Sequence, residues 1–496
     1  MQSPSSRIGA NTIAVLLTGV AALRVLMVHR NYGLLGLDSY PIAHASLVTS
    51  GVDLWRILLN PLMDGPIGRM YYRPLVHLAF AFDGLLWGLE PAGYHLTSAC
   101  IFAFTGLAVY ALVVAALPRA SPLVPLVVLA VFLVHPVHAA VLPVPPRRGD
   151  LLCLAFMALA AAAQARAATR RGSEVSFLPA LATGLALASN EKAFVLPAIC
   201  LMIAFLYTNG GASRRVRRTM AHAVPIVAVF AATIGIRLGV LGGVIGARPL
   251  RDGDYISSAI SMVTNVGRGV LGAGYEVGMF VLGFAALAAG LSRLRIGGDR
   301  PSAAPWRAVV VGAVWVGLVA GLYSMGLILP RWYFMVPLGG ALLVIGAAAT
   351  TLMTAWRRPE LLPRIAAAGG VLCLAVLFLQ LAVRSPLFRP YPEYASATVE
   401  TREYLATLAD RIDAAPDGTL LWLPAPPTAV PRSTGPGYAF VGIAPHTVKA
   451  WAALMFPTRQ IRTETRRGRV GPIDARELVL LLGRPMRPAK STGATR

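Results

Sequence analysis

The sequence predicts an α-helical polytopic membrane protein with a small α/β C-terminal domain. Three observations predict this fold class. Hydrophobic residues make up 56% of the 496 residues and charged residues only 14%, and the mean hydropathy is +0.64. A soluble protein of this size needs a more polar surface. Apolar stretches of roughly 20 residues, enough to cross a bilayer of about 30 Å, recur from Ile13 to Val383, and we expect about eleven transmembrane helices.

The first apolar stretch, residues 11–29, follows a single arginine and shows no convincing small-residue cleavage site. Many other spans follow it, so we interpret it as a retained helix and not as a cleaved signal. The further predicted spans are 94–117, 121–141, 150–167, 175–190, 193–208, 219–241, 273–291, 307–328, 332–354 and 364–383.

Arginine separates the connections between these spans into two groups. By the positive-inside rule, the arginine-rich connections lie in the cytoplasm. These hold Arg119; Arg166, Arg170 and Arg171; Arg214, Arg215, Arg217 and Arg218; Arg293, Arg295 and Arg300; and Arg357, Arg358 and Arg364. The outer face then receives residues 30–93, 145–150, 190–192, 248–255 and 330–331.

Two domains are expected, a transmembrane domain at 1–384 and a C-terminal extracytoplasmic domain at 385–496. The large first outer loop, 30–93, mixes apolar residues with Asp64, Arg69, Arg73, His77 and Asp83, which predicts interfacial helices. In the tail, 396–415 reads as an amphipathic helix and 419–424 as a strand. The Pro- and Gly-rich piece 424–445 indicates a loop, and the last ten residues are expected to be disordered.

A net charge of +23 raises the question of nucleic-acid binding. We exclude it, because much of the arginine lies in short connections where it orients the protein in the membrane. The cysteines, Cys100, Cys153, Cys200 and Cys373, lie in apolar runs without metal-ligand or disulfide spacing, and they say nothing about redox state.

The ionisable residues of the predicted outer face come from six separate places in the sequence. Each alone is explained as a snorkelling or anchoring residue, whereas several that converge would line a cavity. His135 and His138 would share a helix face and permit a metal pair, but histidines with satisfied hydrogen bonds are commoner at a helix end. The set is Asp38, Arg73, His135, His138, Arg148, Asp150, Glu191, Lys192 and Arg331.

Six short motifs occur in the order seen in one superfamily. They are LDSY at 37–40, YYRPLVHLAFAFD at 71–83, EPAGYHL at 90–96, HPVH with RRGDLL at 135–152, SNEKAFVLP at 189–197 and LPRWYFMVPLGGALL at 329–343. Over roughly residues 10–380 the chain resembles multi-spanning glycosyltransferases of the GT-C class, in particular the protein O-mannosyltransferase-like and TMTC-like branch. The tail after Val383 lies outside the resemblance and has no obvious tetratricopeptide array.

The resemblance implies transfer of a sugar from a polyprenyl-phosphate carrier to an acceptor on the outer face. The acceptor hydroxyl needs a base, and the departing lipid phosphate needs positive charge. Asp38 matches the acidic residue of the family's first loop and is implied as the catalytic base. The implied phosphate-binding cations are Arg73, Arg148, Lys192 and Arg331. Asp150 matches the last acid of the family's GRAD-like motif and would orient Arg148 or a nearby histidine; Glu191 matches the glutamate of a KE-like pair. The histidines of HPVH would line the wall of the site.

The chain departs from the family pattern at two places. Asp38 is followed by Ser39 where members often carry a second acid, and Ala139 and Ala140 stand where a Thr-Glu pair usually follows HPVH. A divergent acceptor, a changed donor or a degenerate enzyme each explains these losses. No cofactor or metal site is assigned, and a divalent cation stays an open alternative.

We therefore expect a hexosyl- or pentosyltransferase in a bacterial inner (cytoplasmic) membrane. Its partners would be a polyprenyl-phosphate-linked sugar, membrane lipids and a glycan, lipid or protein acceptor. One alternative is a transporter or flippase for a lipid-linked glycan, which would also need outward cations; the chain shows no internal repeat of the transporter kind. Another is a non-catalytic membrane scaffold that presents the C-terminal domain. The arginine-rich end, with Arg459, Arg462, Arg466, Arg467 and Arg469, is read as a solvated face or a contact to anionic lipid or glycan.

Overall fold

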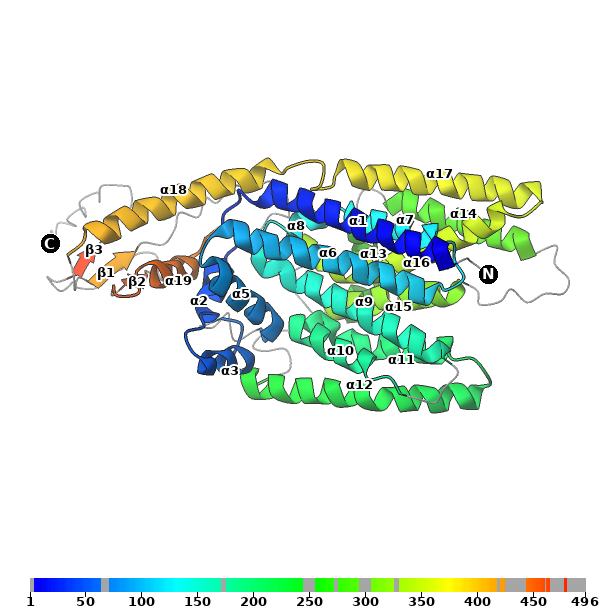
Figure 1. Ribbon diagram of the computed structural model, residues 1–496, viewed down its shortest axis with the longest axis horizontal. Helices are drawn as coiled ribbons and strands as arrows, with labels where there is room; N and C mark the ends of the chain where they lie inside the picture. Colours follow the sequence, from blue (N-terminus) through cyan, green and yellow to red (C-terminus); the bar gives the residue numbers. More distant parts are fainter. Residues whose placement is uncertain are drawn as a thin grey trace, which may run out of the picture.

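The computed structural model is a bundle of long helices with shorter helices and the C-terminal segment gathered at one end (Figure 1). The residues that the structure describes are 4–63, 71–170, 175–243, 255–271, 275–293, 305–324, 330–416, 420–423, 443–459, 461–463 and 477–479.

The predicted spans coincide with helices, and seven of the described helices are long and apolar enough to cross a membrane. The fold is therefore that of a multi-pass helical membrane protein. Five of the seven lie in α1 (Pro4–His29), α6 (Pro91–Ala116), α12 (Ala212–Leu241), α15 (Trp306–Ser324) and α17 (Leu361–Val383). The other two each join a 3-10 turn to a helix: Pro145–Thr169 joins η1 (Pro145–Arg147) to α9 (Arg148–Thr169), and Arg331–Trp356 joins η4 (Arg331–Phe334) to α16 (Met335–Trp356).

The other predicted spans form shorter helices. A Pro in the first turn begins α10 and α11, where its missing N–H leaves no hydrogen bond unmade. A helix thus lies at the position of each of the about eleven expected spans, but only seven of the described helices are long and apolar enough to cross a membrane. The shorter helices are α7 (Leu123–Leu133), α10 (Leu178–Ser189), α11 (Leu196–Tyr207) and α14 (Tyr275–Arg293), of which only Glu276–Ala289 counts as an apolar helix.

Helix α9 lies at the centre of the bundle and packs against α6, α10, α11 and α16. Its alanines, among them Ala155, Ala158 and Ala162, are fully buried. Small side chains let neighbouring helices approach closely where lipid offers no hydrophobic force for packing. Helices α15 and α16 approach equally closely. A Cβ added at Gly312 would lie 2.4 Å from the carbonyl oxygen of Gly340, so only glycine fits at this contact.

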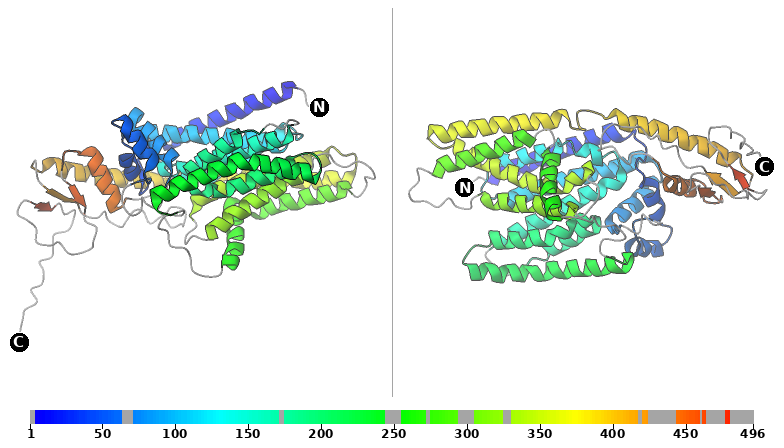
Figure 2. Two further views of the ribbon diagram at one scale, coloured as in Figure 1. Left: turned by 90° about the horizontal axis from the view of Figure 1, so that it is seen from below. Right: turned by 180° about the vertical axis from the view of Figure 1, so that it is seen from behind.

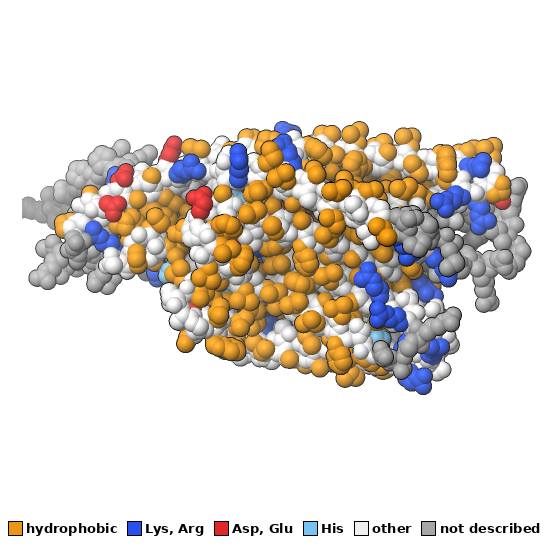
Figure 3. Space-filling model, viewed as in Figure 1, with side chains coloured by type: hydrophobic (Ala, Val, Ile, Leu, Met, Phe, Trp, Pro, Cys, Tyr) orange, Lys and Arg blue, Asp and Glu red, His pale blue; other side chains and the backbone are white. Residues whose placement is uncertain are grey.

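The arginine-rich connections gather at one end of the bundle. In the space-filling view, apolar side chains cover the long flank and Lys and Arg side chains are densest toward the right end (Figure 3). Two contacts fix this arrangement: Arg218 Nη1 donates to the carbonyl oxygen of Arg170 at 2.8 Å, and Arg7 Nη2 donates to that of Pro118 at 3.0 Å. The predicted separation of the connections by charge therefore holds among the described residues, and which end faces the cytoplasm stays a prediction.

Two expectations about the elements were wrong. The cluster from Arg214 to Arg218 was expected in a connection before residue 219, but it forms the first turns of α12, which begins at Ala212. Residues 255–271 were not expected to form an element, yet they form α13 (Tyr255–Leu271), which runs across the long helices (Figure 2). The amphipathic sequence of α13 mixes Ser, Thr, Asn and Arg with its apolar residues, so no apolar run marked it.

The first loop forms short helices at the other end of the bundle: α2 (Ser39–Ala45), α3 (Gly51–Leu59) and α5 (Pro74–Trp87). Helix α5 packs against α6 and α10, so it is part of the bundle and not only a surface helix. His77 is buried, with its Nδ1 3.2 Å from the carbonyl oxygen of Ile57. The expected interfacial residues Asp64 and Arg69 lie outside the described residues.

The C-terminal segment returns to this first loop. Helix α18 (Pro392–Ala414) covers the predicted amphipathic helix, and the Thr398 hydroxyl accepts a hydrogen bond of 3.1 Å from the Gly33 N–H. Helix α19 (Pro445–Met455) packs against α2. Three short strands pair in parallel in the order β2-β1-β3: β1 (Leu420–Leu423), β2 (Ile461–Thr463) and β3 (Glu477–Val479).

A separate α/β domain at 385–496 stays a prediction. The described strands are only three or four residues long. The predicted loop 424–445 and the basic end lie largely outside the described residues.

Candidate functional site

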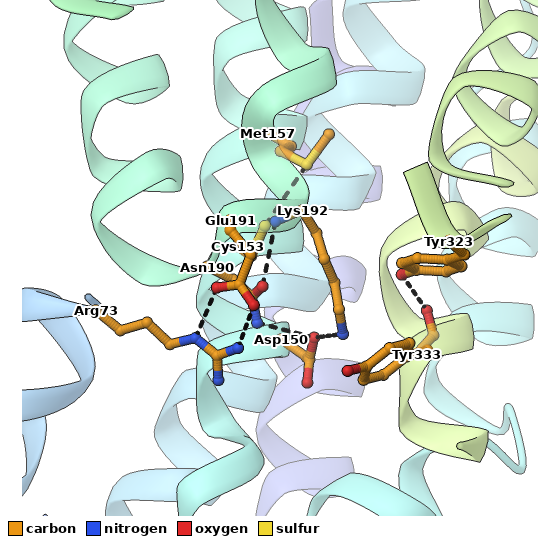
Figure 4. A network of polar contacts seen from close by, with 9 residues as sticks. All are labelled: Arg73, Asp150, Cys153, Met157, Asn190, Glu191, Lys192, Tyr323 and Tyr333. Carbon is orange, nitrogen blue, oxygen red and sulfur yellow. Dashed lines mark hydrogen bonds and ion pairs between the residues drawn. The ribbon is translucent and has the colours of Figure 1, made fainter. Parts of the chain in front are cut away.

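Two ion pairs meet at the N-terminal end of α9 (Figure 4). The Arg73 guanidinium binds the Glu191 carboxylate through two hydrogen bonds, Nε to Oε2 at 3.0 Å and Nη2 to Oε1 at 2.7 Å. The Lys192 ammonium pairs with the Asp150 carboxylate, and both side chains are almost fully buried. The structure thus brings together four of the residues that the sequence predicted, from three separate segments.

The turn between α10 and α11 holds this network. It is the 3-10 element η2 (Glu191–Val195), and the Asn190 side chain caps it by accepting a hydrogen bond of 3.2 Å from the Lys192 N–H. The Asn190 amide also donates to Asp150 Oδ1 at 3.2 Å. Asn190 was not among the predicted site residues, although it stands directly before Glu191 and Lys192 in the SNEKAFVLP motif.

The environment of Lys192 suits an anion. Burial lowers the pKa of its ammonium below the ordinary value, although the Asp150 carboxylate acts in the opposite direction. A second anion at this position would stabilise the charged form further. The ammonium also lies 3.8 Å from the centroid of the Tyr333 ring, a cation–π distance.

Aromatic residues of η4 close over this end of the bundle. Trp332 stacks on the guanidinium of Arg147, which lies 3.8 Å from the ring centroid, while Tyr333 lies against Lys192. The Tyr323 hydroxyl donates a hydrogen bond of 2.7 Å to the carbonyl oxygen of Tyr333 and so ties η4 to α15. The LPRWYFMVP motif therefore supplies aromatic walls next to the two cations.

Arg147 is a residue that the sequence reasoning missed. It ends the 3-10 turn η1 (Pro145–Arg147), is buried, and donates to the carbonyl oxygen of Ala140 at 2.6 Å. The carboxylates of Asp150 and Asp38 both act electrostatically on its guanidinium. In the sequence, Arg147 is marked only by its position beside Arg148 in the RRGD motif. Sequence alone does not show which of two adjacent arginines faces the site.

Arg148 does not join the predicted phosphate-binding cations. Its guanidinium forms an ion pair with Asp83 of α5 in which both side chains are essentially inaccessible to solvent. Its Nε donates to the carbonyl oxygen of Pro145 at 3.0 Å. The expectation that Asp150 orients Arg148 or a histidine was wrong, because Asp150 binds Lys192 and Asn190 instead.

The histidines of the HPVH motif do not line the wall of the network. The N–H of Val137 donates to His135 Nδ1 at 3.1 Å, so the ring proton is on Nε2 and points to the carbonyl oxygen of Val270 in α13. His138 is buried between aromatic rings, and its Nε2 donates to the carbonyl oxygen of Phe132 at 2.6 Å. Nor do they share a helix face, since α7 has ended and α8 (His138–Val141) begins only at the second histidine. Both histidines hold the fold together.

The side chains of Asp38 and Arg331 are more exposed to solvent than those of the buried network. Asp38 stands directly before α2 with its side chain 40% exposed, and its Oδ1 lies 3.8 Å from His446 Nε2 of α19. Arg331 is exposed at the start of η4, next to Trp332. An accessible carboxylate and an accessible cation thus lie at the same end of the bundle as the buried network.

Within the described ranges, no three His, Cys, Asp or Glu side chains come together as ligands for a metal ion. The divalent cation that the sequence left open therefore has no assigned residues, and metal dependence stays a matter for measurement.

Gly149 lets α9 begin next to α5 and α10. A Cβ at this position would lie 2.8 Å from Val76 Cγ2 and 3.1 Å from the carbonyl oxygen of Ser189. We expect Gly149→Ala to lower the free energy of unfolding by about 1–3 kcal/mol, because backbone must move to admit the methyl group. Gly239→Ala in α12, where nothing lies within 4 Å, is the matched control. Thermal unfolding in detergent checks both, and equal Tm values for the two variants would contradict the close approach.

No family model and no curated protein sequence matches the chain. The solved structure of ArnT from Cupriavidus metallidurans in the apo state is similar, with 12% identity over 92% of this chain and 90% of that chain and a TM-score of 0.49. The structure of the same protein bound to undecaprenyl phosphate has 14% identity over 90% of this chain and 89% of that chain, with a TM-score of 0.46. The arabinofuranosyltransferase AftD from Mycobacteria gives 14% identity over 89% of this chain but 32% of that chain, with a TM-score of 0.46.

Proposed function

We propose that this protein is a GT-C-type membrane glycosyltransferase that moves a hexose or pentose from a polyprenyl-phosphate carrier to an acceptor hydroxyl at the outer membrane face. The observation that carries the proposal is the meeting of buried cations with an accessible carboxylate at the end of the bundle opposite the arginine-rich connections. Ionisable groups in an apolar bundle are expensive and mark functional sites. The six ordered motifs that resemble the GT-C class support the same reading.

Asp38 is proposed as the catalytic base. Its carboxylate is 40% exposed, so an acceptor hydroxyl can reach it. The proton of that hydroxyl passes to Asp38 as the oxygen attacks the anomeric carbon of the sugar. The bond from that carbon to the phosphate oxygen then breaks in a single displacement with inversion, and polyprenyl phosphate leaves with the bonding electrons.

The departing phosphate needs positive charge already in place. We assign this role to Lys192 and Arg73, which are held in fixed positions by Asp150 and Glu191, and to Arg331 at the exposed start of η4. Arg147 adds positive charge near Asp38 and Asp150. We assign Arg148 no role in binding the phosphate, because its guanidinium is buried in an ion pair with Asp83. The histidines are likewise given no role in the reaction.

The membrane placement is part of the proposal. The arginine-rich end would face the cytoplasm of a bacterial inner membrane, so that α2, α3, α18 and α19 lie outside. Residues 385–496 would then form an extracytoplasmic domain over the site, and the acceptor would be a glycan, a lipid or a protein.

The test is release of free polyprenyl phosphate in liposomes. Purified protein would be reconstituted with labelled polyprenyl-phosphate hexoses or pentoses and with cell-envelope extract as a source of acceptor. We expect one donor to release polyprenyl phosphate with transfer of its sugar to the extract. Movement of intact donor across the bilayer without release of phosphate would instead identify a flippase.

A further inference from the structure

Helix α19 is attached directly to the segment that carries Asp38. The Thr447 hydroxyl donates a hydrogen bond of 2.7 Å to the carbonyl oxygen of Leu37, 410 residues earlier in the sequence. Tyr40 of α2 packs against the cluster formed by α18 and α19, and Leu454 of α19 packs against the cluster formed by the first loop. The first turn of α19 is therefore held in a defined position beside Asp38.

This position brings His446 to the candidate base. Its Nε2 lies 3.8 Å from Asp38 Oδ1, which is ion-pair distance but too long for a hydrogen bond. The same nitrogen is shielded from solvent and has no hydrogen-bond partner. Although the His446 side chain as a whole is 34% exposed, its Nε2 atom faces the protein.

A shielded ring nitrogen without a hydrogen-bond partner is unfavourable, because it has lost its hydrogen bonds to water. Asp38 Oδ1 is the anionic acceptor that lies near it, and the Asp38 side chain has room to move because it is 40% exposed. A rotation of either side chain that brings Nε2 closer to Oδ1 would complete a hydrogen bond between them. On the bundle side, α2, which begins directly after Asp38, packs against η1, the turn that ends at Arg147.

We propose that His446 is a positioning residue for Asp38: its Nε2–H donates to the carboxylate and holds it toward the acceptor hydroxyl. The C-terminal segment would then complete the site, and its docking on α2 would be required for full activity. This inference rests on the proposed function, since it assigns His446 a role through the base of that reaction. His446 has no counterpart in the motifs that the sequence singled out.

The first test separates kcat from KM in the liposome assay. We expect His446→Ala to lower kcat about tenfold, because a misplaced catalytic group loses rate, and to leave KM for the lipid donor unchanged. His446→Gln keeps an N–H donor and should recover most of the rate. Lys449→Ala, an exposed position on the same helix, should behave as wild type.

Three results would overturn the proposal: wild-type kcat in His446→Ala, a Gln variant as slow as the Ala variant, or an equal loss in Lys449→Ala. The last would show that α19 acts only through general packing.

The second test does not need activity. Thermal unfolding of wild type, Asp38→Asn, His446→Ala and the double variant forms a double-mutant cycle, and we expect the two changes to be non-additive because the side chains interact. Additive Tm changes would reject the contact. If wild type released no polyprenyl phosphate while the cycle showed coupling, the proposed function would fail and the contact between α19 and Asp38 would stand.

Discussion

Asp38→Asn is expected to lower the release of polyprenyl phosphate by about 10²- to 10⁴-fold, the usual contribution of a general base. Asparagine keeps the shape of the side chain but cannot accept the proton of the acceptor hydroxyl. The Asp38 side chain is partly exposed and belongs to no buried ion pair among the described residues, so the variant should fold, with a Tm lowered only by the weakened contact to His446. Donor affinity should also be retained, because the cations assigned to the phosphate are unchanged.

The matched control is Asp410→Asn, the same substitution at an exposed position of α18. It should retain wild-type turnover. Wild-type turnover in Asp38→Asn would remove Asp38 as the base, and the accessible carboxylate would then need another role, such as binding the acceptor.

The second large effect concerns stability. Arg148→Ala leaves the Asp83 carboxylate buried without its partner, and breaking a buried ion pair from one side costs about 3–5 kcal/mol. Changing both partners, Arg148→Met with Asp83→Leu, removes the unpaired charge and should recover much of the loss. Unfolding in detergent measures both effects.

The control for this pair is Arg56→Ala. Arg56 lies 3.4 Å from Asp53 and is about half exposed, and exposed pairs contribute roughly 0–1 kcal/mol. A wild-type Tm combined with lost turnover in Arg148→Ala would show instead that Arg148 contacts the donor, as the family resemblance implied. The two outcomes separate a structural arginine from a phosphate-binding one.

The proposed function also makes a demand on how a donor would bind to the network. Lys192 and Arg73 already hold carboxylates, so a phosphate would share these cations with Asp150 and Glu191 and would not find them unpaired. Fixed cations of this kind need no rearrangement when charge develops on the leaving group. The carboxylates therefore serve to keep the cations in place in the apolar bundle.

The sequence by itself determined the class of the fold. Apolar runs of bilayer length mark helices because the backbone must satisfy its own hydrogen bonds in lipid, and arginine marks one group of connections because charge is excluded from the hydrocarbon core. The same reasoning pointed to Asp150, Glu191, Lys192 and Arg73, since charged residues at the ends of apolar runs must find partners. Local proline and asparagine signals also agree with the turns η1 and η2.

Only the tertiary structure decided which charges pair. Arg73 meets Glu191 across 118 residues and Arg148 meets Asp83 across 65, whereas the two arginines of RRGD, adjacent in sequence, face different partners. A helix turns by about 100° per residue, so neighbours in sequence point apart and the packing of other helices selects their contacts. The approach of His446 to Asp38 depends in the same way on α19 docking against α2. Composition and periodicity determine which residues enter the membrane, but only long-range packing determines which side chains share a site.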